Sequence, residues 1–96
     1  MNSEHIAKTK LVKEEIIQKI NEKISTLSGV KSLSRFDKKT GIHCFTLYSK
    51  EKNLNFFIEI DDNCLCKYYS FKDGEDSCYF NVGDVDLIIS KIDLYF

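Results

Sequence analysis

Three stretches in the middle of the chain decide the fold: Ile42–Ser49 (IHCFTLYS), Leu54–Asp61 (LNFFIEID) and Cys64–Phe71 (CLCKYYSF). Each is rich in aromatic and β-branched residues and alternates, imperfectly, between apolar and polar positions, which is the pattern of a β-strand. The connectors, residues 50–53 (KEKN) and 62–63 (DN), are short and polar. Asp and Asn both tolerate the positive backbone angles of a tight hairpin turn. The pattern therefore predicts three consecutive antiparallel strands.

The lengths of the two connectors predict how these strands align. A four-residue loop at 50–53 places Leu47 opposite Phe56, and a two-residue loop at 62–63 places Phe56 opposite Tyr69. Both loops gather apolar residues on one face, whereas a slip of one residue would scatter them over two. Lys67 is the one charged residue on that face. The predicted apolar face carries Phe45, Leu47, Leu54, Phe56, Ile58, Ile60, Leu65, Tyr69 and Phe71.

The opposite face of the predicted sheet carries an aromatic row. The same alignment brings Thr46, Phe57 and Tyr68 side by side, and a hairpin at residues 73–74 (Asp-Gly) adds Tyr79. Beside this row lie Tyr48, Cys44, Glu59 and Cys66. An antiparallel sheet can leave one face in water, but such a face rarely carries a row of aromatic rings. The row is therefore the surface on which function is expected.

Helices are predicted on both sides of the strands. Residues 3–28 repeat apolar side chains at spacings of three and four, with Gly29 as the residue that ends the helix. Val30–Phe36 and Ser77–Val82 are further strands, and a last helix begins at residues 83–84. The predicted fold class is α+β: an N-terminal helix, a five-stranded antiparallel meander sheet and a C-terminal helix, in a single domain over residues 1–96. The N-terminal helix should cover the apolar face, whereas the pattern leaves open which face the C-terminal helix covers.

Composition bounds the function. The 96 residues are 43% apolar and 30% charged with a net charge of −1, so no overall field attracts nucleic acid or an anionic membrane. The N-terminal residues lack the apolar core of a signal peptide, and no apolar run approaches the roughly 20 residues of a membrane span. Four cysteines without an export signal favour reduced thiols. We expect a cytoplasmic protein.

Metal binding and catalysis are not expected. Cys64 and Cys66 are separated by one residue, closer in sequence than the pairs of zinc knuckles. In the predicted register Cys44 and Cys66 lie on either side of Glu59, about 9.6 Å apart, too far to share one zinc ion. His43 is adjacent to Cys44 and projects from the opposite face of its strand. We therefore predict no catalytic residues, no metal ligands and no cofactor.

Direct nucleic-acid binding is less favoured than protein binding. The order helix, strands, helix is similar in outline to the double-stranded RNA-binding domain, but that family begins its last helix with lysines. Here residues 83–86 read Gly-Asp-Val-Asp, which would repel phosphate. An aromatic row can stack single-stranded bases, yet this one neighbours Glu59 and Asp61.

The sequence therefore favours a protein partner. Aromatic residues with acids at the rim are typical of the centre of a protein interface, and a homodimer would also cover the row. The acids of residues 59–76 (Glu59, Asp61, Asp62, Asp73, Glu75 and Asp76) could imitate nucleic-acid phosphates against a basic groove. The expected partner-binding residues are Tyr48, Phe57, Glu59, Asp61, Tyr68 and Tyr79.

At the level of a class, the small, Lys- and Ile-rich, motif-free chain resembles phage-encoded inhibitors of host defence, including anti-CRISPR-type proteins. The resemblance implies a non-enzymatic inhibitor that occludes a nucleic-acid-processing effector. The alternatives are a toxin-neutralising immunity protein or accessory subunit, and a zinc- or single-stranded-nucleic-acid-binding domain.

Overall fold

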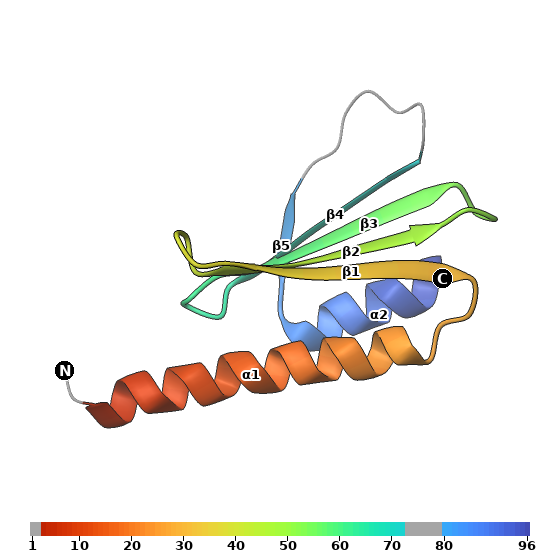
Figure 1. Cartoon of the computed structure of the whole chain (residues 1–96). Coiled ribbons are helices and arrows are strands. Elements are labelled where there is room, and N and C mark those ends of the chain that lie inside the picture. The colour runs from red at the N-terminus through yellow and green to blue at the C-terminus, as the bar shows by residue number, and fades with distance from the viewer. Residues whose placement is uncertain (1–2, 73–79) are drawn as a thin grey trace.

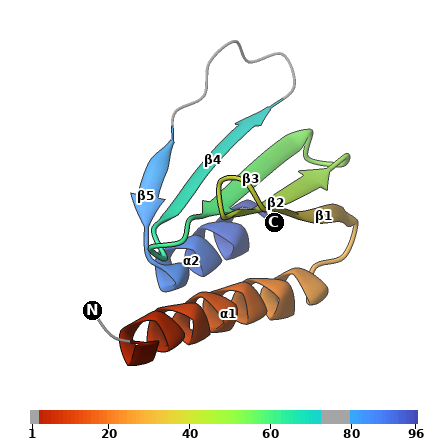
Figure 2. The same ribbon diagram turned by 60° about the vertical axis from the view of Figure 1, so that its left-hand side comes forward.

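The structure is a computed structural model that describes residues 3–72 and 80–96, with side chains from residue 12 onward. Five antiparallel strands follow one another across a single sheet, in the order of the chain. Both helices lie on the same side of that sheet (Figures 1 and 2). The α+β arrangement expected from the sequence is confirmed. The elements are α1 (Ser3–Ser25), β1 (Val30–Asp37), β2 (Ile42–Ser49), β3 (Leu54–Ile60), β4 (Cys66–Lys72), β5 (Asn81–Gly83) and α2 (Val85–Tyr95).

The core lies between the helices and one face of the sheet. Alternate residues of β2 and β3 point toward the helices and are buried, whereas the residues between them are only partly covered. The apolar stripe of α1 meets them through Ile16 and Ile20, and α2 through Ile88 and Ile92. This decides what the sequence left open: α2 joins α1 on the apolar face. The buried strand residues of this face are Phe45, Leu47, Ser49, Leu54, Phe56, Ile58, Ile60, Cys66 and Tyr68.

The helix ends follow from local hydrogen bonds. The prediction placed the end of α1 at residue 28, but the helix ends at Ser25. Ser25 and Thr26 each donate a hydrogen bond from the side-chain hydroxyl to a backbone carbonyl of the last turn. In a longer helix these carbonyls would instead accept from backbone amides of the next turn. At the other helix, Asp84 accepts a hydrogen bond from the Leu87 amide and caps the start of α2. An ion pair between Lys23 and Asp93 joins α1 to α2.

The predicted register is correct between β2 and β3 and wrong between β3 and β4. Leu47 lies opposite Phe56, as the four-residue loop implies. However, Phe56 lies opposite Ser70 and not Tyr69, so β4 is displaced by one residue. Cys66 and Tyr68 therefore face the helices, and Lys67 faces away from them. The unexplained lysine of the predicted apolar face was the sign of this slip.

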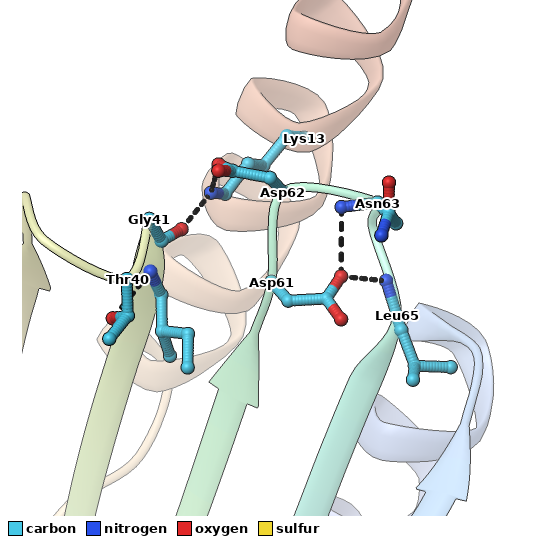
Figure 3. Close-up of polar contacts among 8 residues, drawn as sticks. Lys13, Thr40, Gly41, Asp61, Asp62, Asn63 and Leu65 are labelled. Atoms are coloured by element: carbon cyan, nitrogen blue, oxygen red, sulfur yellow. Dashed lines mark hydrogen bonds and ion pairs between the residues drawn. The ribbon is translucent and has the colours of Figure 1, made fainter.

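The cause of the slip is the turn after β3 (Figure 3). The Asp61 carboxylate accepts hydrogen bonds from the Asn63 and Leu65 amides, both at 2.9 Å. The Asp61 amide in turn donates to the Leu65 carbonyl, so these two residues close the hairpin. Cys64 takes a φ of +64°, the left-handed residue that ends a three-residue hairpin loop. The loop is thus one residue longer than predicted, because a cysteine occupies a conformation usually given to glycine.

The end of the predicted sheet also differs. The fifth strand was placed at Ser77–Val82, with Phe80 and Val82 on the helix side, whereas β5 spans Asn81–Gly83. Val82 pairs with Lys67 of the outward set, so it faces away from the helices. The proposed Asp73-Gly74 turn and Cys78 lie outside the described residues.

Lys13 fastens α1 to one end of the sheet. Its ammonium donates to the Gly41 carbonyl in the β1–β2 turn and pairs with the Asp62 carboxylate in the β3–β4 turn at 3.0 Å (Figure 3). It also lies 5.5 Å from the centroid of the Phe36 ring. One side chain thus joins two turns and a helix. Gly41 has a φ of +72°, and a Cβ there would collide with the Asp62 carboxylate.

We expect Gly41→Ala to lower the free energy of unfolding by about 2 kcal/mol, because it adds left-handed strain and displaces Asp62 from Lys13. Gly29→Ala is the matched control, since Gly29 has the same φ but open space around its Cβ position; it should cost about 1 kcal/mol. Urea unfolding of both variants measures the difference. In a protein that also carries Asp62→Ala, Gly41→Ala should cost no more unfolding free energy than Gly29→Ala. A larger cost that persists there would contradict the collision with Asp62 as its cause.

His43 makes stability depend on pH. Burial lowers the pKa of its imidazole below the ordinary 6.5, and the nearby Lys13 charge lowers the pKa further. The unfolded chain therefore binds this proton more readily, and stability falls as the pH drops through 6.5 toward the folded pKa. Urea unfolding between about pH 7.5 and pH 5.5 should show a shallower decline for His43→Gln than for the wild type. An equal decline in both proteins would show that another group is responsible.

Candidate functional site

The face of the sheet that points away from the helices, here the open face, carries the candidate site. Cross-strand pairing aligns Leu33 of β1 with Thr46, Thr46 with Phe57, and Phe57 with Tyr69. Tyr69 contacts Phe80 ahead of β5, with ring centroids 4.5 Å apart. An apolar line thus crosses the sheet from edge to edge. We call these five residues the open-face row.

Four rings of the open face form one cluster: Phe57, Tyr69, Phe71 and Phe80. The Phe57 ring lies nearly parallel to Tyr69, at 4.7 Å between centroids, and to Phe71, at 5.6 Å. Tyr69 and Phe71 are themselves nearly parallel, with centroids 6.4 Å apart. The three rings therefore stack in an offset arrangement. Phe80 meets Tyr69 edge-on.

This surface is more apolar than an open face needs to be. Leu33 is 66% exposed, Phe80 54% and Val82 59%, and all three lie on or beside the open-face row. Scattered apolar residues on a protein surface are ordinary, but a contiguous apolar patch is typical of an interaction site. The stacked rings hold the patch rigid, since each covers part of its neighbour.

Basic side chains border the row. Arg35 lies beside Leu33 on β1, and the cross-strand order continues from Arg35 through Cys44 and Glu59 to Lys67. On the other side of the row, Lys31 pairs with Tyr48. Asp37 follows Arg35 on the same face of β1. Three basic residues therefore accompany the acids Glu59 and Asp37 on this part of the open face, so charges of both signs border the row.

A shallow hollow of about 250 Å³ lies beside Phe57. Thr46 and Cys44 belong to its lining, together with Leu33, Arg35 and Glu59. It is large enough for one side chain of a partner, and its lining offers an apolar ring, a guanidinium and a carboxylate. Such a hollow suits an anchor residue of an interface rather than a whole cofactor.

The structure brings together only part of the predicted site. Tyr48, Phe57 and Glu59 lie on the open face as expected. Tyr68 does not: it is 7% exposed and stacks on Phe56 beneath the helices. Its placement on the outer face was wrong because β4 is displaced by one residue. The Asp61 carboxylate is engaged by its own turn. Tyr79 lies outside the described residues.

Several residues of the surface were missed. Tyr69 and Phe71 were assigned to the core, and Leu33, Lys31 and Arg35 were not assigned to any site. One sequence signal could have found the first two. Shifting β4 so that Lys67 faces water also turns Tyr69 and Phe71 outward.

The cysteines are separated by the sheet. Cys44 lies on the open face and Cys66 is buried beneath the helices, so their predicted placement on one face was wrong. Burial raises the pKa of the Cys66 thiol to about 11, with the Cys64 thiol and Asp61 adding to the effect. Burial and Glu59 also raise the pKa of Cys44. Raised pKa values make poor nucleophiles. Within residues 3–72 and 80–96, no three His, Cys, Asp or Glu side chains are grouped as metal ligands.

No protein-family model, no curated protein and no solved structure matches this chain. Neither helix of the described chain is both long enough and apolar enough to span a bilayer.

The two adjacent tyrosines of β4 test the face assignment. Tyr68→Ala should lower the free energy of unfolding by about 3 kcal/mol, because it leaves a cavity against Phe56. Tyr69→Ala should cost about 1 kcal/mol, the scale of lost ring stacking on an open surface. Chemical denaturation of both variants gives the comparison. A larger loss at Tyr69 than at Tyr68 would restore the register predicted from the sequence.

Proposed function

We propose that this protein is a non-enzymatic binding protein that docks on a protein partner through its open face. The observation that carries the proposal is the ring cluster on a sheet face that neither helix covers, where Phe80 is exposed and the other three rings are only partly buried. Burying such a patch against a partner is favourable by roughly 25 cal/mol for each Å² of apolar surface removed from water. The rings are already held by one another, so little side-chain freedom remains to be lost on binding.

The kind of partner follows from the border of the patch. Lys31, Arg35 and Lys67 favour a surface that carries acids around an apolar centre. The hollow beside Phe57 would receive one apolar or aromatic side chain, with Arg35 in reach of an adjacent carboxylate. A protein surface of that composition fits both the shape and the charge of the open face.

Single-stranded nucleic acid is the second candidate, because the same three basic residues could contact phosphates. Base stacking, however, needs free ring faces. Phe57 stacks on both Tyr69 and Phe71, and Tyr69 also packs against Phe80. The cluster therefore offers less stacking surface than four separate rings would. This argument favours a protein partner.

Within this proposal, the protein acts by occupying a functional surface of its partner, as a cytoplasmic inhibitor of the phage-encoded, anti-CRISPR type or as an immunity protein would. Imitation of nucleic-acid phosphates receives no support at two of the acids considered for it. Asp61 is held by its turn, and Asp62 is paired with Lys13. Glu59 lies among basic residues of the open face. Asp73, Glu75 and Asp76 lie outside the described residues. The proposed inhibitor therefore works mainly through its rings.

The test is capture of partners from a lysate of the encoding organism on immobilised protein. Phe57→Lys should lower the affinity for a captured partner by about 30-fold or more, because it places a charge at the centre of the apolar contact. Asn21→Lys is the matched control: it adds the same charge on an exposed position of α1 and should change nothing.

Two outcomes would contradict the proposal. One is a partner that binds Phe57→Lys and the wild type equally well while both remain folded by circular dichroism. The other is tight binding of single-stranded oligonucleotides whose affinity falls steeply with salt, which would favour the second candidate.

A further inference from the structure

The outer edge of β1 is a second feature that the proposed docking face does not use. Figures 1 and 2 place β1 at the border of the sheet, with β2 on its inner side. The strand is eight residues long and pairs with β2 without a bulge. Its outer backbone amides and carbonyls are thus available over its full length. Such an edge is a template for another strand.

The helices leave room for that strand. Side chains of β1 that point to the helix side, Ser32 and Ser34, are exposed, and Phe36 is 51% exposed. The helix layer therefore stops short of this edge. The edge lacks two of the usual protections, since β1 is neither short nor interrupted by proline, although it does carry charged side chains. Its charges, Lys31, Arg35 and Asp37, are of both signs.

We propose that β1 pairs with β1 of a second copy of this chain, antiparallel and around a two-fold axis that passes beside Ser34. The two sheets would then join into one continuous sheet of ten strands. This proposal does not depend on the proposed docking function, because the strands pair through the backbone of the β1 edge, although Lys31, Leu33 and Arg35 lie on the open face as well.

The charges of β1 select the register. With Ser34 opposite Ser34, each Lys31 lies opposite Asp37 of the second copy, which gives two ion pairs by symmetry. Leu33 then lies opposite Arg35, whose aliphatic stem can cover it. Among the described residues none of these three charged side chains forms an ion pair within the chain. They are therefore available to a second copy.

Neighbouring registers are worse. A shift by a single residue would bring an outward side chain opposite one that points to the helix side, which a two-fold axis through one sheet forbids. Centring the pair on Leu33 sets Lys31 opposite Arg35, and centring it on Arg35 sets that residue opposite itself. Like charges directly opposite each other are destabilising. Of these three registers, only the one centred on Ser34 sets opposite charges against each other and no like charges.

The dimer would have a consequence for the open face. A two-fold axis perpendicular to the sheet turns both open faces to the same side. The two open-face rows would then end side by side, with Leu33 of each copy opposite Arg35 of the other, and a partner would meet two ring clusters on one surface. Two linked sites bind a repetitive partner far more tightly than one.

The experiment measures the mass of the whole protein by light scattering and sedimentation at low salt, at concentrations up to about 1 mM. Lys31→Asp alone and Asp37→Lys alone should each weaken the dimer by about tenfold or more, because two attractive pairs become repulsive. A mixture of the two variants should form the heterodimer, since position 31 of each copy then again faces the opposite charge at position 37 of the other.

The controls separate charge effects from misfolding. Asp37 also accepts a hydrogen bond from the Lys39 amide, so Asp37→Asn keeps that bond while it removes the charge, and it should weaken the dimer several-fold. Lys50→Asp, in the β2–β3 loop away from the edge, should have no effect. Circular dichroism and thermal unfolding confirm that each variant is folded.

A wild-type protein that stays monomeric at about 1 mM would overturn the proposal. So would a dimer that is lost on Phe57→Lys but unaffected by both single charge reversals, because the open face and not β1 would then be its interface. Failure of the mixed variants to recover the dimer would overturn the register.

Discussion

The hydrogen bonds that Asp61 accepts from the backbone of its own turn decide which side chains of β4 face the helices. With the Asn63 and Leu65 amides bound to the carboxylate, the loop takes three residues and Cys64 takes a left-handed conformation. Since strand side chains alternate, this single residue of loop length sends Tyr68 inward and Tyr69 outward. The composition of both faces follows from it.

The inward set is closed by the helices. Tyr68 stacks on Phe56, and Ile88 and Ile92 of α2 complete the same core. Because α2 lies beside α1 on one face, no element of the described chain is left to cover the other. The open face is therefore a direct result of where the second helix packs. Its apolar row is not a by-product of weak alternation, since the rings stack on one another in a defined arrangement.

The surface chemistry follows from the same geometry. Turning Lys67 outward adds a third basic residue to the open face, directly opposite Glu59. Two of the acids that the sequence offered for recognition serve the fold: Asp61 builds a turn, and Asp62 anchors α1 through Lys13. Asp84 likewise caps α2. Charged residues that look alike in a sequence thus divide into those that hold the fold and those that face a partner.

The sequence by itself determined the fold class, the order of the elements, the β2–β3 register and the outward position of Phe57. Those features depend on periodicity and on one loop of unambiguous length, both of which are local. Only the tertiary structure decided that Tyr68 is core, that Tyr69 and Phe71 belong to the site, and that α2 leaves one face open. The face of each β4 side chain depends on Cys64, whose positive φ residue propensities disfavour for a non-glycine residue. The open face depends on α1 and α2, far apart in the sequence, packing side by side. The apolar stripe of α2 does not by itself determine that packing, because it would fit either face of the sheet.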